Sequence, residues 1–469
     1  MPNPHVERAQ EWLRQHEQDL LNDTIAMLQI PSLESEALPN APYGAECRRA
    51  LDLALQLGHD YGFVTKDIEG HIGYCEFGSG KGLVMSLGHL DVVPVGPGWK
   101  HAPFGAEIVD GYIYARGTTD DKGPSMAAFY AARAIKETVG DLGARIRIVF
   151  GCNEESGFGC IHRYTQTEEA PTFGVAPDSG WPLIHAEKGI ANLIVEAPLN
   201  SGEFALIELA GGQRPNIVID HCVARVRVAA SARSHVEGKV ADSWDRNLTL
   251  SWNGDVLTVE AIGKACHGSI PYGGDNAAAR AMRFLAEASP LSTQTYFEEL
   301  SWLTHPSGVG VGIHGRDDVS QDLTSNLGIV STSGSAVQFT INVRYPVTWK
   351  GDVLRDRALA HLASLKSGLT LAQFTDSPSL YFPLDHPLVD TLVRVYQEET
   401  GDMETKPGVM GGGTYARAIP NTVSIGTSWE GDGLAHETDE RLKIEHLFRA
   451  SRIYAHMFIE LAMLAAQTE

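Results

Sequence analysis

The chain has 469 residues, 43% of them hydrophobic, and a formal net charge of -22 at pH 7. This length exceeds the size at which one hydrophobic core usually keeps growing, so two domains are expected. The negative charge, with no basic patch, excludes nucleic acid and acidic membranes as partners, because both would be repelled.

Helical patterns alternate with short apolar runs up to about residue 190. A long amphipathic helix is predicted at the start of the chain, and an alanine-rich helix from Ser125 to about Thr138. Strands are predicted near residues 83–87, 112–115, 145–150 and 173–176. This alternation is typical of an α/β fold.

The middle of the chain, residues 190–377, has a different pattern, dominated by strands such as 217–228. A hairpin is predicted in LTLSWNGDVLTV, where Asn253-Gly254 suits a type I′ turn. In AVQFTINVRYPV the apolar positions alternate with polar ones, which places Arg344 on the face opposite the buried one, available to a ligand. We expect a second domain here.

Helix and strand patterns resume after about residue 378, and the chain ends in an amphipathic helix predicted from about Asp439 to Ala466. The similar patterns at the two ends predict one domain, formed by residues 1–189 and 378–469. The second domain, residues 190–377, would then be an insertion.

Histidines and carboxylates follow the predicted strands. In chain order they are His89, Asp120 in RGTTDDKG, Glu154 and Glu155 in CNEESG, Asp178 in APDSG, and His436 in GLAHETDE. In open α/β sheets, sites gather at the carboxyl ends of strands. Imidazoles with carboxylates suit zinc, cobalt or manganese, and the number of carboxylates exceeds what one tetrahedral ion needs. The pattern therefore indicates two ions that share a bridging carboxylate.

Each of these pieces is common by itself. A single histidine after a strand is more often structural than a ligand, and paired carboxylates are usually solvated. A Gly-Gly-Gly run such as 411–413 is most often a turn, and GKACHGS is compatible with any loop. The evidence for a metal site is that all these pieces occur together in one chain and in one order.

That order resembles a known family. The motifs GHLDVVP, RGTTDDKGP, NEESG, APDSG, GKACHGSIPYGGDNAA and GLAHETDE are similar to those of the dizinc metallopeptidases that include carboxypeptidase G, acetylornithine deacetylase and succinyl-diaminopimelate desuccinylase. The length, the DDKGP form and the segments LTSNLGIV, INVRYPV and GGGTYAR most resemble the PepV-type dipeptidases. The resemblance implies an α/β catalytic domain with a central mixed sheet flanked by helices, interrupted by an inserted α+β lid domain.

The resemblance also assigns the metal ligands. It makes His89 and Asp178 ligands of one zinc ion, Glu155 and His436 ligands of the other, and Asp120 the bridge. The cofactors implied are two Zn²⁺ ions, with Co²⁺ or Mn²⁺ as alternatives. It further implies a cis peptide bond between Asp120 and its neighbour.

Two acidic residues beside the ligands receive catalytic roles from the same resemblance. Asp91 is similar to a carboxylate that orients the histidine ligand and raises its basicity. Glu154 resembles the general base of the family. Because successive strand residues point apart, we expect Glu155 to hold metal while Glu154 faces the attacking water.

The inserted domain supplies the remaining candidates. His267 matches the family histidine that helps to form the oxyanion site, with Asn216 as a companion. Arg344 would hold the terminal carboxylate of the substrate, because a guanidinium grips a carboxylate bidentately. Backbone N–H groups of the glycine loop would assist it, at Gly412, Gly413 and Thr414.

The function implied is metal-assisted hydrolysis of short peptides that carry a free C-terminal carboxylate. Two rivals stay open: an N-acyl-amino-acid amidohydrolase with the same dizinc mechanism, and a catalytically silent relative that binds peptide. A dipeptidase differs from a deacylase by an acceptor for the substrate ammonium, for which Asp121 and nearby lid residues are candidates.

Partners and location complete the expectations. The inserted segment is longer than the lid of dimeric family members, so we expect a monomer whose lid acts in cis on a small peptide. The six cysteines lack CxxC pairing, and the polar start MPNPHVERAQEWLRQ does not resemble a signal peptide. No stretch of the sequence reaches the length of a membrane span. A cytoplasmic location is therefore expected.

Overall fold

The computed structural model describes residues 3–467. The chain forms two compact units. Unit 1 consists of the chain up to His185, Phe382–Gly408, and the chain from Gly413 onward, and unit 2 consists of Ala186–Tyr381 with Val409–Gly412. Within residues 3–467, no helix combines the length and apolar character needed to cross a bilayer.

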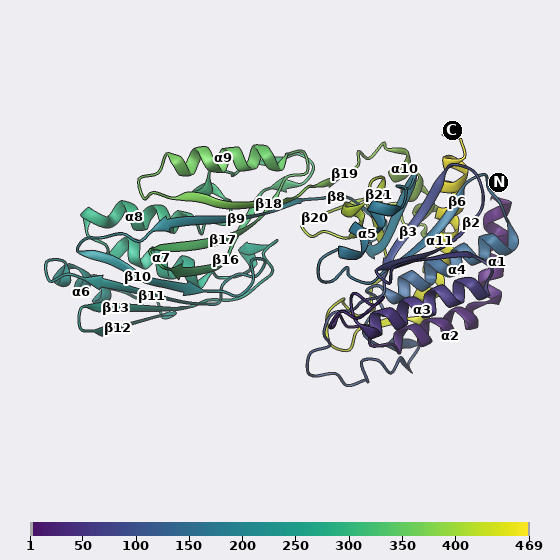
Figure 1. Ribbon diagram of the computed structural model, residues 1–469, viewed down its shortest axis with the longest axis horizontal. Coiled ribbons are helices and arrows are strands. Elements are labelled where there is room, and N and C mark those ends of the chain that lie inside the picture. The colour runs from purple at the N-terminus through teal and green to yellow at the C-terminus, as the bar shows by residue number, and fades with distance from the viewer. Residues whose placement is uncertain (1–2, 468–469) are drawn as a thin grey trace. The chain divides into compact units, whose positions relative to one another are not determined.

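A mixed sheet forms the centre of unit 1 (Figure 1), with strand order β1-β2-β6-β3-β7-β21-β8. The strands are β1 (Val64–Ile68), β2 (Ile72–Phe77), β3 (Leu83–His89), β6 (Arg145–Gly151), β7 (Phe173–Ser179), β8 (Leu183–Glu187) and β21 (Thr422–Gly426). Strand β3 runs parallel to β6 and β7, and β21 runs parallel to β7. The other pairs are antiparallel. The predicted α/β fold with a central mixed sheet is confirmed.

Helices flank this sheet. They are α1 (Pro4–Gln15), α2 (Glu17–Leu28), α3 (Ala45–Asp60), α4 (Lys122–Thr138), α5 (Gly159–Thr167), α10 (Pro387–Thr400) and α11 (Ile444–Ala465). Helix α4 is the alanine-rich helix predicted from the sequence, and it begins three residues earlier than expected. It packs against β3 and β6 and also against α1, α2 and α11. Because it is enclosed by all these elements, its small side chains are buried all round.

Unit 1 also contains a small antiparallel sheet, and one prediction was wrong because this sheet was not foreseen. It contains β4 (Glu107–Val109), β5 (Tyr112–Tyr114) and β22 (Arg441–Lys443). Pairing of β22 with β5 draws residues 441–443 into extended structure, so the last helix begins at Ile444 and not near Asp439. His436 lies before this strand, in an irregular loop.

Unit 2 contains an antiparallel sheet with the order β12-β13-β11-β10-β16-β17-β9-β18. Its strands are β9 (Gly189–Pro198), β10 (Phe204–Gly211), β11 (His221–Val228), β12 (Leu248–Asn253), β13 (Val256–Ile262), β16 (Thr324–Ser333), β17 (Ala336–Tyr345) and β18 (Thr370–Ser377). Its helices are α6 (Arg233–Ala241), α7 (Ala277–Ala288), α8 (Leu291–Trp302) and α9 (Gly351–Ala363). The short strands β14 (Arg316–Asp317) and β15 (Gln321–Asp322) pair with each other. The short strands β19 (Leu380–Tyr381) and β20 (Gly408–Met410) each pair with β8.

The alternation predicted in β17 is present. Val337, Phe339, Ile341 and Val343 are fully buried in the core of unit 2. Strand β9 alternates in the same way, with every second residue buried. One face of this sheet therefore packs into the core, as is typical of antiparallel sheets.

The predicted hairpin forms with a different turn. Asn253 pairs with Val256, so the two loop residues are Gly254 and Asp255. Of these two, Gly254 alone has a positive φ, of 62°. A type I′ turn needs positive φ at both loop residues, whereas type II′ needs it at the first, where glycine is favoured. The type I′ prediction was wrong because Asn253 is the last residue of the strand.

Replacing Phe339 with Ala tests the packing of the unit 2 core. The side chain is fully buried, so the variant should lose about 3–5 kcal/mol of unfolding free energy, measured by urea titration. The control Thr340→Ala lies on the opposite, half-buried face of the same strand and should change the unfolding free energy by less than about 1 kcal/mol. Equal midpoints for the two variants would contradict the buried packing of Phe339.

Candidate metal centre and active site

Three of the predicted ligands follow neighbouring parallel strands of unit 1. His89 is the last residue of β3, Asp178 lies near the end of β7, and Glu155 lies in the turn after β6. Because these strands run parallel, their carboxyl ends meet at one edge of the sheet. Asp120 reaches this edge from the loop between β5 and α4, and His436 from the loop before β22.

Asp120 lies between the two histidines. His89 Nε2 is 2.9 Å from Oδ1 of Asp120, and His436 Nε2 is 2.9 Å from Oδ2 of the same carboxylate. His436 Nε2 is also 3.2 Å from Oε1 of Glu155. Ligand atoms of His89, Asp120 and Glu155 all lie within 4.8 Å of one another. The structure thus brings together four of the five predicted ligands in direct contacts.

The remaining acidic groups share the same electrostatic environment. Burial raises the pKa of Glu154 to about 8, and the charges of Glu155 and Asp120 add to this effect. Burial also raises the pKa of Asp178 well above its usual range, with contributions from Asp120 and Glu154. Hydrogen bonds to Asp120 and Glu155 raise the pKa of His436 to about 10. The raised pKa values of Glu154 and Asp178 reflect the crowding of several carboxyl groups at one edge of the sheet.

This donor set fits divalent metal ions. Two imidazoles and several carboxylates are the ligands of zinc and of related first-row ions. Buried carboxylates that repel one another need positive charge beside them, which a divalent cation supplies. Asp120 presents one oxygen toward each histidine, as a bridging ligand of two ions would.

Asp91 organises two neighbours of the site. Its carboxylate accepts hydrogen bonds from the backbone N–H groups of Glu154 and Glu155, each at 3.1 Å. Its backbone carbonyl lies 3.0 Å from His89 Nδ1, and its carboxylate lies 3.6 Å from the same nitrogen. If Nδ1 donates here, Nε2 presents its lone pair to a ligand. Asp91 therefore orients the histidine and also fixes the turn.

Two inferences from the sequence need correction. Glu154 and Glu155 lie in a turn and not in a strand, so strand alternation does not apply to their side chains. Asp121 is fully buried, and its Oδ2 accepts from the backbone N–H of His89 and from Ser125. Asp121 is therefore not accessible to a substrate ammonium. The peptide bond between Asp120 and Asp121 is cis, as the resemblance implied.

The two oxyanion candidates lie side by side in unit 2. Ile217 and His267 form an isolated β-bridge, and the backbone N–H of Gly268 donates to the carbonyl of Asn216 at 2.7 Å. His267 Nδ1 lies 2.7 Å from Ser269 Oγ and accepts from the Ser269 backbone N–H at 3.3 Å. With Nδ1 accepting, the ring proton of a neutral His267 is on Nε2, which can donate.

Arg344 lies on the predicted face of β17, but its environment differs from the expectation. It is 5% exposed, so it is neither solvated nor open on all sides. Its Nε donates to Oδ1 of Asn342, and its Nη1 donates to the carbonyl of Gly411 at 2.8 Å. Its positive charge also acts on His267, whose pKa is lowered first by burial and then by Arg344. The guanidinium is held in a fixed orientation.

The glycine loop is divided between the units. Gly412 belongs to unit 2, and Gly413 and Thr414 belong to unit 1. The Thr414 hydroxyl contacts Ser424 Oγ and accepts from the backbone N–H of Ala416, where it caps a short 3₁₀ helix. Its side chain therefore has a structural role within unit 1.

The prediction from the sequence missed a buried pair, Arg116 and Glu440. Both lie inside the motifs that carry ligands, RGTTDDKGP and GLAHETDE, and each is 1% exposed. Each motif that carries a ligand holds a charged residue with no assigned role, but nothing in the sequence showed that the two would meet.

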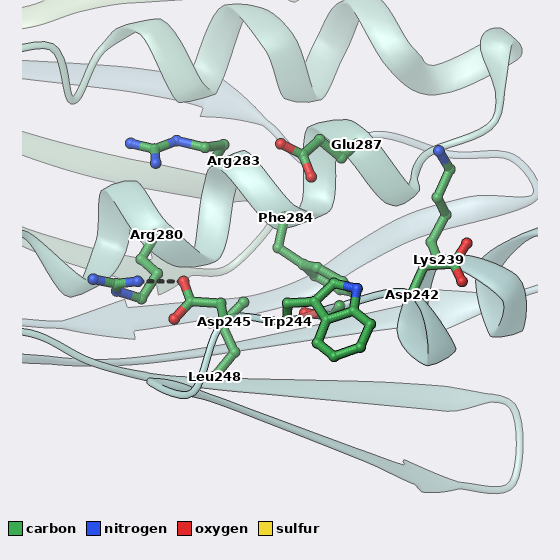
Figure 2. Close-up of a pocket in the computed structure, with 10 residues that line it drawn as sticks. Lys239, Asp242, Trp244, Asp245, Leu248, Arg280, Arg283, Phe284 and Glu287 are labelled. Carbon is green, nitrogen blue, oxygen red and sulfur yellow. Dashed lines mark hydrogen bonds and ion pairs between the residues drawn. The ribbon is translucent and has the colours of Figure 1, made fainter.

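A hollow of about 400 Å³ in unit 2 has a different chemistry (Figure 2). Trp244 and Phe284 lie at its centre, and Arg280 forms an ion pair with Asp245. Its lining holds charges of both signs and neither histidine nor cysteine. Compared with the strand ends of unit 1, this hollow lacks the imidazole ligands of a metal centre.

Comparison with known proteins identifies the family. The sequence profile of peptidase family M20/M25/M40 matches residues 85–460. The chain is 36% identical over 461 residues to "Putative dipeptidase YtjP" of Bacillus subtilis strain 168, covering 95% of this chain and 97% of that protein. It is 34% identical over 477 residues to "Putative dipeptidase SAB1611c" of Staphylococcus aureus, covering 97% and 99%. The chain belongs to peptidase family M20/M25/M40, a family of metal-dependent peptidases.

Solved structures share the fold. The dipeptidase Dug1p of Saccharomyces cerevisiae has a TM-score of 0.57 and 14% identity, covering 98% of this chain and 99% of that one. Human carnosine dipeptidase 1 has a TM-score of 0.54 and 16% identity, covering 97% and 99%. At these identities the likeness concerns the fold alone.

Removing one charge from Asp91 tests its double role. Asp91→Asn replaces one acceptor oxygen by an NH₂ group that faces a backbone N–H, so the turn and His89 should both shift. We expect a loss of about 10–100-fold in kcat/KM or in metal affinity. The control Asp110→Asn removes the same charge from an exposed loop and should leave both unchanged. Wild-type values in Asp91→Asn would contradict this role.

Proposed function

We propose that this chain is a metal-dependent dipeptidase that hydrolyses the amide bond of short peptides with a free C-terminal carboxylate. The observation that carries the proposal is the pair of 2.9 Å contacts that His89 and His436 make with the two oxygens of Asp120. A carboxylate shared in this way matches a bridging ligand. The full-length similarity to proteins named as dipeptidases supports the substrate class.

The proposed cofactors are two Zn²⁺ ions, which Co²⁺ or Mn²⁺ can replace. One would be held by His89 and Asp178, the other by Glu155 and His436, with Asp120 between them. When bound, two such ions supply Lewis acidity at the scissile carbonyl.

Glu154 is the proposed general base. Its side chain is half-buried, and burial raises its pKa to about 8, which favours acceptance of a proton near neutral pH. The backbone contact with Asp91 holds it in place. Glu154 would take a proton from the attacking water and pass it to the leaving amine.

His267 and Asn216 are the proposed oxyanion donors. Burial and the charge of Arg344 lower the pKa of His267, so its ring is neutral near pH 7. Its contacts with Ser269 favour the tautomer with the proton on Nε2. A neutral N–H donor stabilises negative charge that develops on the carbonyl oxygen.

Arg344 is the proposed anchor for the substrate carboxylate. Its contacts with Asn342 and Gly411 hold the guanidinium in one orientation, which reduces the entropy lost on binding. The backbone N–H groups of Gly412, Gly413 and Thr414 would assist. An anchor of this kind selects short substrates with a free C-terminus.

The nearest rival function is an N-acyl-amino-acid amidohydrolase. The burial of Asp121 removes one candidate acceptor for the substrate amine, so the dipeptidase function requires another. A catalytically silent relative is disfavoured, because all five candidate ligands and Glu154 are present.

Location and assembly remain proposals. We propose a cytoplasmic protein, because all six cysteines are free and thiols persist in reducing compartments. We further propose a monomer in which unit 2 is a lid that serves the metal centre of its own chain. Co-expression of Glu154→Gln with His267→Ala subunits tests this: no recovered activity is expected, and recovery would indicate exchange between chains.

A substrate panel tests the function directly. Protein stripped with a chelator should be inactive, and added Zn²⁺ or Mn²⁺ should restore cleavage of free dipeptides. N-acetylated dipeptides, dipeptide amides and tripeptides should be poor substrates, because the site accepts a free amine and a free carboxylate at a fixed separation. Preference for the acetylated compounds would assign the chain to the deacylases.

Replacing Glu154 with Gln separates proton transfer from metal binding. The amide keeps the shape of the side chain but cannot accept the proton, so kcat should fall by about 10²–10⁴-fold. Metal content per chain, measured by elemental analysis, should stay at the wild-type value. The control Glu445→Gln, on the exposed start of α11, should leave kcat unchanged. Wild-type kcat in Glu154→Gln would refute its role as the base.

A further inference from the structure

A buried ion pair joins the two loops that carry Asp120 and His436. Nη1 of Arg116 lies 2.7 Å from Oε2 of Glu440, and both residues are 1% exposed. Arg116 follows β5 and Glu440 precedes β22, and these two strands pair with each other. The pair therefore lies at the base of both loops.

Glu440 fixes the segment that leads into Asp120. Its Oε1 accepts hydrogen bonds from the backbone N–H groups of Gly117 at 3.1 Å and of Thr119 at 2.9 Å. The hydroxyls of Thr118 and Thr119 also donate to this oxygen, at 3.3 and 3.0 Å. Three consecutive residues before Asp120 are thus tied to one carboxylate.

Arg116 holds the other loop by its backbone. Its guanidinium donates to the carbonyls of Glu437 at 3.2 Å and of His436 at 3.4 Å, the latter belonging to a candidate ligand. It also donates to the carbonyl of Pro94 at 3.5 Å, in the segment that follows β3. One side chain therefore contacts both the loop that carries His436 and the segment that follows His89.

His436 needs this support more than His89 does. The His436 side chain is 54% exposed and that of His89 is 1% exposed, so packing fixes His89 but not His436. The backbone of His436 has a φ of 66°, a region that residues other than glycine rarely adopt and that the surroundings must maintain. A buried ion pair is weak evidence for stability, because desolvation offsets its attraction. The Arg116–Glu440 pair is better explained by the hydrogen bonds with which it fixes the two loops.

We propose that Arg116 and Glu440 are positioning residues that keep His436 and Asp120 in register for the metal ion held on the Glu155–His436 side. This inference rests on the proposed dinuclear centre. Disrupting the pair would weaken that ion most, because its side loses support for both His436 and Asp120, whereas the His89–Asp178 side loses support for Asp120 alone.

The test measures metal affinity in the full-length apoprotein by Zn²⁺ titration calorimetry, with Co²⁺ absorption spectra as a second readout. Arg116→Met and Glu440→Gln should weaken the ion on the Glu155–His436 side, called the second ion, by about 10–100-fold. The ion on the His89–Asp178 side should be weakened less. Turnover should fall at low metal concentration and recover when metal is raised, with KM unchanged.

Two further variants separate positioning from stability. In Arg116→Met/Glu440→Gln both partners are uncharged and Oε1 still accepts from Gly117 and Thr119, so thermal stability should recover relative to Arg116→Met while the second ion stays weak. The matched control is Arg147→Met, which removes a buried guanidinium on β6 that pairs with Glu76 on β2. It should lose stability without a change in metal affinity.

The outcomes distinguish this inference from the proposed function. Wild-type protein that binds fewer than two ions would overturn both. Wild-type protein with two ions, together with Arg116 and Glu440 variants of unchanged affinity, would overturn the positioning role alone. Second-ion affinity that recovers in step with stability in the double variant would also overturn it, because the pair would then be structural.

Discussion

The two oxygens of Asp120 face two histidines, one at the end of β3 and one in a loop, and the centre depends on these contacts. It exists because parallel strands end at one edge and place carboxylates side by side in a buried environment. Burial and mutual repulsion raise the pKa values of Glu154 and Asp178, so the site is costly without added positive charge. A divalent cation supplies two positive charges at one point, whereas a basic side chain supplies one.

Much of this centre could be predicted from local sequence. The buried run of β3 and the turn residues after β6 are each set by contiguous residues, so the places of His89 and Glu155 follow from short patterns. The alternation in β17 likewise predicted its buried face correctly. The family resemblance then supplied what spacing could not, above all the role of Asp120 between the two histidines.

The features of the site that could not be predicted from the sequence depend on tertiary contacts. Arg116 and Glu440 are 324 residues apart in the chain, and no local pattern brings them together. The start of α11 was misplaced because β22 pairs with a distant strand, and Arg344 was expected to be open because the carbonyl of Gly411 was not foreseen as its partner. Each error comes from a contact between segments remote in sequence.

The two histidines of the centre are held in different ways, and this difference has a chemical consequence. His89 is enclosed at the end of a central strand, so its position is set by the sheet. His436 is half-exposed on a loop, so its position is set by hydrogen bonds to its backbone. A rigid ligand fixes geometry, whereas an exposed one adjoins the solvent from which water and peptide arrive. The loop side is therefore where precise support matters most, and the structure provides a buried guanidinium and carboxylate there.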